Sequence, residues 1–204
     1  MRKQLVETVR SKGITDRAVL AALGKIPRHW FMDSLLDFHA YQDKAFPIGA
    51  GQTISQPYTV AFQTVLLKVK PGDKILEIGT GSGYQAAVLM ELGARVFSIE
   101  RKKELHLKAK RLLNEMGYFP EKLIYGDGYR GLPGHAPFRG IIVTAGAPFV
   151  PKALLEQLDI GGRLVIPLGE DEQEMTVFTR KSDKQFSKET YGAFRFVPLL
   201  KDKD

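Results

Sequence analysis

The sequence predicts an α/β fold, a doubly wound and mostly parallel sheet with helices on both faces. Between residues 57 and 170, short apolar runs alternate with segments whose apolar residues recur at helical spacing. This alternation is typical of parallel strands joined by crossover helices. Beyond residue 170, two strand-like runs follow each other without a helix between them, which indicates an antiparallel hairpin at the edge of the sheet.

The individual elements follow from changes in hydrophobic period along the chain. Apolar residues before Phe31 predict two short N-terminal helices, the second capped by Thr15 or Asp16. Pro57 suits the first position of a helix that ends before Pro71-Gly72. The remaining predictions are, in order, helix Pro57–Val69, strand Lys74–Ile78, helix Tyr84–Leu92, strand Arg95–Ile99, helix Lys102–Met116, strands Lys122–Tyr125 and Ile141–Thr144, helix Pro151–Leu158, strand Arg163–Pro167, and hairpin strands Met175–Arg180 and Ala193–Val197.

A glycine-rich turn, Gly79–Gly83, follows the first of these strands. Its glycines allow positive φ and let a ligand approach the backbone closely, at the position where the crevice of an open α/β sheet forms. Glu100 ends the next strand, 21 positions after Gly79, near the ~20-residue spacing at which a carboxylate accepts hydrogen bonds from ribose hydroxyls. A structural turn and a helix-entry carboxylate are the alternatives. Together the two features favour a cofactor that contains adenosine.

Residues beside the turn indicate S-adenosyl-L-methionine, with S-adenosyl-L-homocysteine as product. A dinucleotide turn would place glycine at position 84, where Tyr84 stands. Glu77 would face the ammonium of a methionine moiety but would repel a pyrophosphate. Asp127, between two glycines, would reach the adenine amino group or is an ordinary turn residue. An NAD-linked oxidoreductase and a non-catalytic cofactor-binding module are the alternatives.

Seven segments carry a resemblance to a known family. They are Ile26-Pro27-Arg28-His29 with Phe31, Gly51-Gln52-Thr53-Ile54-Ser55-Gln56-Pro57, Leu76–Ala86, Gly126-Asp127-Gly128, Ile141–Ala145, Gly161–Pro167, and Phe196-Val197-Pro198-Leu199. With these motifs, nearly the whole chain resembles the protein-L-isoaspartate O-methyltransferase family. The Gln52–Pro57 and Val197–Leu199 runs make the match specific to this family, whereas the glycine turn is common to methyltransferases in general.

The resemblance implies a Rossmann-like methyltransferase sheet and methyl transfer to the free carboxylate of L-isoaspartyl residues in damaged proteins and peptides, which begins their repair. It implies that Ser55 is the active-site serine. It also implies that the cofactor is held by Thr53, Ile54, Glu77, Gly79, Gly81, Gly83, Glu100, Asp127 and Gly128, and that Val197 and Pro198 line the substrate peptide. Arg139 departs from the family, which usually carries an acid there, and we expect this to change local charge rather than activity.

The predicted chemistry needs no general base, because a carboxylate nucleophile with a pKa near ~3.9 is already ionised. The histidines are scattered, without metal-binding HExxH spacing or a serine elbow, and we expect no metal. We expect Ser55 to position the carboxylate; alternatively, it only caps or precedes the helix that begins at Pro57. The segment Phe46–Gln56, with Gly49 and Gly51, would supply a mobile lid.

At 204 residues the chain suits one domain. We expect a helical appendage and active-site loop over residues 1–56, a cofactor-binding core over 57–170 and edge strands over 171–204. There is no cysteine, no signal-peptide core and no apolar run near the ~20 residues that span a bilayer, so we expect a cytoplasmic protein without disulfides or thiolate zinc.

The net charge of +7 raises the alternative of an RNA-modifying enzyme. The densest basic cluster, Arg101–Arg111, is interleaved with apolar residues at helical spacing. This pattern favours the solvated face of an amphipathic helix over an RNA-binding surface. We therefore expect a monomer that acts on isoaspartyl proteins and peptides, without a nucleic-acid or membrane partner.

Overall fold

The computed structural model describes residues 1–204, and its centre is a seven-stranded sheet of order β5-β4-β3-β6-β7-β8-β9. Strands β3 to β7 pair in parallel, and β8 and β9 are antiparallel, as the sequence predicts. The strands are β3 (Lys74–Ile78), β4 (Arg95–Glu100), β5 (Lys122–Tyr125), β6 (Phe138–Val143), β7 (Leu158–Leu168), β8 (Gln173–Arg180) and β9 (Phe186–Phe194).

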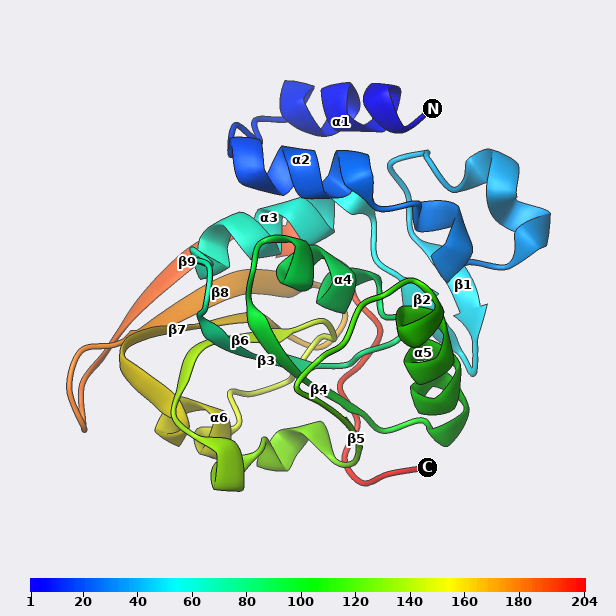
Figure 1. Cartoon of the computed structure of the whole chain (residues 1–204). Helices are drawn as coiled ribbons and strands as arrows, with labels where there is room; N and C mark the ends of the chain where they lie inside the picture. Colours follow the sequence, from blue (N-terminus) through cyan, green and yellow to red (C-terminus); the bar gives the residue numbers. More distant parts are fainter.

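Helices cover both faces of the sheet (Figure 1). They are α1 (Arg2–Ser11), α2 (Arg17–Lys25), α3 (Pro57–Leu67), α4 (Tyr84–Glu91), α5 (Lys103–Glu115) and α6 (Lys152–Glu156). Successive strand side chains point to opposite faces. Ile75 therefore joins the core beneath α1 to α5, and Leu76 joins the core on the side of α6. This two-sided burial gives the near-continuous apolar strands that the sequence shows.

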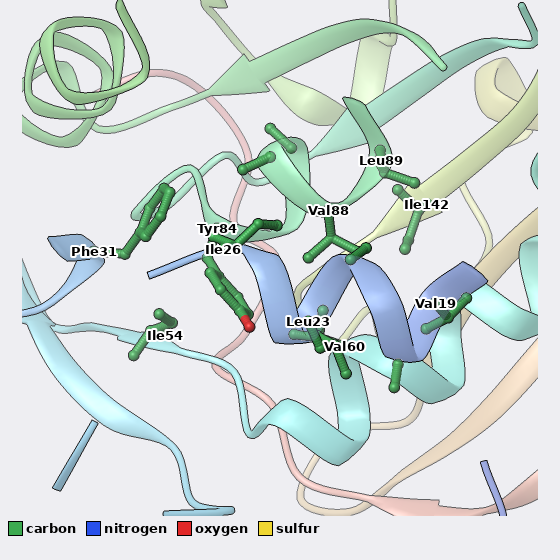
Figure 2. Close-up of a cluster of buried hydrophobic side chains, with 14 of the residues drawn as sticks. Val19, Leu23, Ile26, Phe31, Ile54, Val60, Tyr84, Val88, Leu89 and Ile142 are labelled. Carbon is green, nitrogen blue, oxygen red and sulfur yellow. The ribbon is translucent and has the colours of Figure 1, made fainter. Parts of the chain in front are cut away.

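The two N-terminal helices belong to the larger of these cores. Figure 2 shows Leu23 of α2 beside Val60 of α3 and Val88 of α4, all of them buried. Asp16 caps α2 by accepting hydrogen bonds from the backbone N–H groups of Ala18 (2.9 Å) and Val19 (3.0 Å). The predicted cap is thus confirmed. The division into parts at residues 56 and 170 stays a prediction.

The edge hairpin exists, but its second strand differs from the predicted one. The strand is Phe186–Phe194, and Ala193–Val197 mostly lies beyond it. Most side chains of β9 are exposed or half-buried on an edge strand, so the sequence carries no clear alternation there. After β9 the chain leaves the sheet: Gly146 N–H donates to the Val197 carbonyl at 2.8 Å.

The β6–β7 region starts earlier than the sequence pattern indicates. Strand β6 begins at Phe138 and β7 at Leu158, and the ladder shifts register between Phe138 and Gly140. Exposed Arg139 donates from Nη1 to the Ile160 carbonyl at 3.2 Å, next to this irregularity. Arg139 therefore supports the β6–β7 bulge, away from the carboxyl ends of the strands.

Residues 28–56 form local structure that the sequence did not predict. Two 3₁₀ helices, η1 (Arg28–Phe31) and η2 (Ser34–His39), precede a hairpin of β1 (Phe46–Gly49) and β2 (Gln52–Ile54). Two further 3₁₀ turns, η3 (Gly128–Arg130) and η4 (Pro133–His135), follow β5. These elements are too short for a periodic signal. The hairpin approaches the glycine turn, because a Cβ added at Gly81 would lie 3.5 Å from Ile48.

Candidate active site

A pocket with about 790 Å³ of empty space lies at the carboxyl ends of β3, β4 and β6. Strand order reverses at this point, since β4 lies on one side of β3 and β6 on the other. Such switch points are where open α/β sheets bind ligands. The predicted residues on its wall are Thr53, Ile54, Ser55, Gly79, Gly81, Glu100, Gly128, Val197 and Pro198.

The glycine turn forms the floor of this pocket. Gly79 and Gly81 have φ values of +95° and +53°, which favour glycine. A Cβ at Gly79 would lie 2.5 Å from Thr144 Oγ1. That hydroxyl lies within hydrogen-bonding distance of the Gly79 carbonyl (2.6 Å) and the Ile78 carbonyl (3.0 Å). Thr144 therefore occupies the place that a side chain at Gly79 would need, so only glycine fits at this position of the floor. Gly83, at the start of α4, packs against Leu113 and lies behind the wall.

Glu100 lies on the pocket wall with its carboxylate held from two sides. Its Oε2 accepts a hydrogen bond from Gly81 N–H and its Oε1 accepts one from Lys102 N–H, both at 2.8 Å. Each carboxylate oxygen keeps further acceptor capacity, because a carboxylate offers about four lone-pair sites. A ligand hydroxyl would therefore meet a fixed acceptor at Glu100.

Glu77 lies behind the wall. It is fully buried, and its Oε2 accepts a hydrogen bond from Ser98 Oγ, which in turn lies 2.6 Å from Thr80 Oγ1. Of these residues, Thr80 lines the pocket and Glu77 does not. Burial raises the pKa of Glu77 to about 8, with a further contribution from the negative charge of Glu100. Its Oε1 has no hydrogen-bond partner, and such buried groups commonly mark functional sites.

Asp127 and Gly128 follow β5 at the same end of the sheet. Gly128 lines the pocket, and a Cβ there would collide with Ile78 of β3. Asp127 is next to the wall and caps the following turn, since its Oδ1 accepts from Tyr129 N–H at 2.9 Å. Asp127 therefore has the turn role that the sequence left open, and its second oxygen lies 3.8 Å from Arg130 Nε.

Ser55 stands between this pocket and a second, more open groove. Thr53, Ser55, Thr144 and Val197 line both. Ser55 is half-buried and its hydroxyl makes no hydrogen bond within the protein, and α3 begins without a side-chain cap. The alternative role as a helix cap is therefore absent. Ser55 Oγ is free to contact a molecule that enters from either side.

Arg28 holds the Ser55 backbone, a role that the sequence gave no reason to expect. The side chain is fully buried and donates from Nη2 to the Ser55 carbonyl at 2.9 Å, and from Nε to the Ala40 carbonyl at 3.0 Å. Its guanidinium also lies 4.8 Å from the ring centroid of Tyr84, which lines the pocket. Burial lowers the pKa of Arg28 and raises that of Tyr84 to about 12. A buried arginine that donates to loop carbonyls fixes the loop conformation.

The tail after β9 closes the pocket opposite the glycine turn. Leu199 N–H donates to the Gly146 carbonyl at 2.7 Å, and Tyr129 Oη donates to the Leu199 carbonyl at 3.1 Å. Sequence reasoning missed Leu199 and Leu200 on the wall, together with Thr80 and Thr144. Their position after strand ends was the signal that could have identified Thr80 and Thr144.

No group of three or more His, Asp or Glu side chains is placed to hold a metal, and no helix is long and apolar enough to cross a membrane.

The sheet order, the glycine turn and the pocket at the switch point define a Rossmann-like methyltransferase. The family model described as protein-L-isoaspartate(D-aspartate) O-methyltransferase matches residues 1–204. The chain belongs to this family. Protein-L-isoaspartate O-methyltransferases of Christiangramia forsetii and Flavobacterium johnsoniae are 65% and 63% identical to it; the alignments cover 100% of this chain and 95% and 96% of theirs.

Two solved structures share the whole fold. A structure named protein-L-isoaspartate O-methyltransferase superposes with a TM-score of 0.87 at 30% identity; the match covers 97% of this chain and 65% of that one, just under two thirds. A Plasmodium falciparum structure, described as a candidate member of the same class in complex with S-adenosyl-L-homocysteine, has a TM-score of 0.85 at 26% identity. That match covers 98% of this chain and 99% of the other.

Proposed function

We propose that this protein transfers the methyl group of S-adenosyl-L-methionine to the free carboxylate of L-isoaspartyl residues in damaged proteins and peptides, which initiates their repair. The observation that carries the proposal is that two neighbouring cavities share four lining residues. The pocket at the strand ends and the more open groove meet at Thr53, Ser55, Thr144 and Val197. A small cofactor and a peptide would then meet at the same residues, as a two-substrate transfer requires.

The residues of the pocket at the strand ends fit the cofactor. When bound, S-adenosylmethionine supplies an electrophilic methyl group on a sulfonium. Gly79 and Gly81 line the pocket with backbone atoms alone, and Glu100 would offer fixed acceptors for ribose hydroxyls. Thr53, Ile54 and Gly128 complete the predicted contacts from the wall. Asp127 would reach the adenine amino group from beside the wall, and Gly83 starts the helix that supports the turn.

Glu77 would act on the cofactor side through its neighbours. Its carboxylate lies behind the wall and is connected to Thr80 through Ser98. We therefore assign Glu77 to orienting Thr80 through Ser98, so that it acts on the cofactor through its neighbours rather than in direct contact.

Ser55, Val197 and Pro198 would position the substrate. The carboxylate of an isoaspartyl residue is ionised near neutral pH and attacks without a base. A hydrogen bond donated by Ser55 Oγ orients it, while the tail residues hold the peptide backbone. Bringing the reacting atoms together and excluding water supplies the rate enhancement, a proximity effect worth up to about 10 kcal/mol. The β1–β2 hairpin is the proposed lid, and protection of Phe46–Gln56 from proteolysis by S-adenosylhomocysteine tests this role.

The deciding experiment supplies methyl-labelled S-adenosylmethionine with matched isoaspartyl and aspartyl peptides and with tRNA. We expect label in the isoaspartyl peptide alone, released as methanol in mild base because the product is a methyl ester. Label in tRNA would favour the RNA-methyltransferase alternative, and binding of NADH rather than S-adenosylhomocysteine would favour an oxidoreductase. Absence of label from all three would refute the proposal.

We also propose a cytoplasmic monomer without a nucleic-acid partner. Helix α5 buries Leu105, Ala109 and Leu113 and turns its basic side chains to solvent, so its charge is that of an ordinary amphipathic helix. S-adenosylmethionine is an intracellular metabolite, which supports the location. Sedimentation of the purified protein, and its fractionation from cells, test the two proposals.

A further inference from the structure

Aromatic side chains line the open groove beside the cofactor pocket, and we call this surface the aromatic wall. It consists of Tyr58, Phe62, Tyr191, Phe194 and Phe196. Phe62 is central: its ring centroid lies 5.7 Å from that of Tyr58, 6.2 Å from that of Tyr191 and 5.3 Å from that of Phe194. The rings come from α3, β9 and the segment after β9, so three separate parts of the chain build one surface.

These rings are not fully used in the core. All five are half-buried: each packs against the larger core and keeps part of its surface open. Tyr58 and Phe62 are four residues apart and share one face of α3. Tyr191 and Phe194 project from β9, whose other residues are mostly exposed. Open aromatic surface gathered in a groove is favourably covered by another apolar or aromatic group.

The groove is continuous with the site of methyl transfer. It shares Thr53, Ser55, Thr144 and Val197 with the cofactor pocket. The aromatic wall begins three residues after Ser55, with Tyr58. Residues 57 to 62 span roughly 8 Å of helix at ~1.5 Å per residue. An extended peptide covers that length in about two or three residues.

We propose that the aromatic wall is a specificity site that favours isoaspartyl substrates with an aromatic side chain within a few residues of the isoaspartyl residue. This inference rests on the proposed function. A substrate ring meets ring faces and edges, with which aromatic groups pair favourably at centroid distances of about 4.5–7 Å. The rim of the groove carries both charge signs, Lys12 and Arg195 against Glu172, and Lys12 is already paired with Asp43 at 2.5 Å. Ring packing, rather than net charge, therefore distinguishes substrates.

The test uses heptapeptides with isoaspartate at the centre and glycine elsewhere, with phenylalanine, leucine or glutamate placed at each other position in turn. We expect phenylalanine at one or more positions to raise kcat/KM roughly fivefold over the all-glycine reference, and more than leucine does. A gain below twofold at every position would overturn the aromatic wall as a specificity site. If the reference peptide itself accepts no methyl group, the proposed function fails instead, so the two failures are distinct.

A variant pair connects the effect to the groove. Phe62→Ala removes the central ring. The ratio of kcat/KM for the phenylalanine peptide to kcat/KM for the all-glycine peptide should then fall close to one. Phe119→Ala is the matched control, because Phe119 is 72% exposed in the loop before β5 and does not line the groove; it should keep the full ratio. If Phe62→Ala does not fold, Tyr191→Ala on the edge strand provides a second measurement of the same ratio. Binding of S-adenosylhomocysteine reports folding in each case. An unchanged ratio in both groove variants would contradict the inference.

Discussion

The cofactor side and the substrate side of the site are built differently. On the cofactor side, the polar contacts join Glu77, Thr80, Ser98 and Glu100, all within β3, the glycine turn and β4. On the substrate side, Arg28 reaches carbonyl groups 12 and 27 residues away, at Ala40 and Ser55. The first is a local βαβ unit, and the second is irregular chain held together by one buried side chain.

This difference suits the two ligands. A cofactor is the same molecule in every turnover, so a rigid floor inside a parallel sheet serves it. Damaged proteins present many sequences, and the groove that would receive them is open and lined by half-buried rings. The substrate side therefore depends on one buried side chain that holds an irregular segment, and we expect it to be the easier side to disrupt.

The largest effect is expected from Arg28→Met. The change removes the donor to the Ala40, Lys44 and Ser55 carbonyls. Bonds from charged groups are worth ~1.5–3 kcal/mol each, but burial of the guanidinium is itself costly, so the free energy of unfolding should fall by about 3 kcal/mol in total. Urea denaturation measures it. Because Ser55 loses its anchor, kcat/KM for an isoaspartyl peptide should fall more than the affinity for S-adenosylhomocysteine.

Two further variants serve as controls for Arg28. Lysine at this position keeps a charge without the planar fork and should give an intermediate loss. Arg111→Met, in which the side chain is 75% exposed, should change stability by no more than about 0.5 kcal/mol. Equal losses of peptide turnover and cofactor affinity in Arg28→Met would argue against separate substrate and cofactor sides.

On the cofactor side, Gly79→Ala is the most disruptive small change. The new Cβ would meet Thr144 Oγ1 at 2.5 Å on a backbone with φ of +95°. We expect the affinity for S-adenosylhomocysteine, measured by calorimetry, to fall roughly thirtyfold, or about 2 kcal/mol. Gly117→Ala carries the same kind of backbone strain, with φ of +77°, but has no atom within 4 Å. If both variants bind equally well, close approach to the turn is not what Gly79 provides.

A third expectation concerns the pH dependence that Glu77 creates. Its folded-state pKa of about 8 lies above the ordinary 4.5, so the folded protein holds a proton that the unfolded chain has released. The stability that this bound proton contributes should therefore be fully present below the ordinary pKa and should be lost as pH rises from about 5 to 9, through the folded-state pKa. In Glu77→Gln that part of the dependence should disappear. Glu115→Gln, at an exposed position of α5, should keep it. A wild-type profile in Glu77→Gln would show that Glu77 is not the group responsible.

The same contrast explains what could be predicted from the sequence. The parallel sheet, the glycine turn and Glu100 follow from periodicity and spacing, because each depends on residues close in sequence. The mostly parallel sheet and the cap at Asp16 agree with that reasoning, whereas the order of the strands was not predicted. Glu77 was predicted to contact the cofactor, but its side chain is fully buried behind the residues that line the pocket. Spacing along the sequence does not reveal which side chains of a strand lie inside the core.

The substrate side was predictable only through family resemblance. Arg28 lies in a short 3₁₀ helix, and its partners are backbone carbonyls. Every residue has a backbone carbonyl, so the amino-acid types do not indicate which ones Arg28 contacts. The aromatic wall joins α3 to β9, more than 120 residues apart in sequence. The shift of β9 away from Ala193–Val197 frees Val197 and Pro198 to reach the pocket, which periodicity alone could not indicate.

The smallest effect is expected from Ser55→Ala, at the boundary between the two sides. The Ser55 carbonyl keeps its bond to Arg28, so only the hydroxyl is lost and folding should be unchanged. One neutral hydrogen bond is worth about 1 kcal/mol, so kcat/KM for an isoaspartyl peptide should fall roughly fivefold. The affinity for S-adenosylhomocysteine should stay the same. Ser82→Ala is the matched change on the cofactor wall, where Ser82 Oγ accepts from Tyr84 N–H at 3.3 Å, and it should affect cofactor affinity first. Full turnover in Ser55→Ala would leave positioning of the carboxylate to Val197 and Pro198 and would move the boundary between the two sides toward the tail.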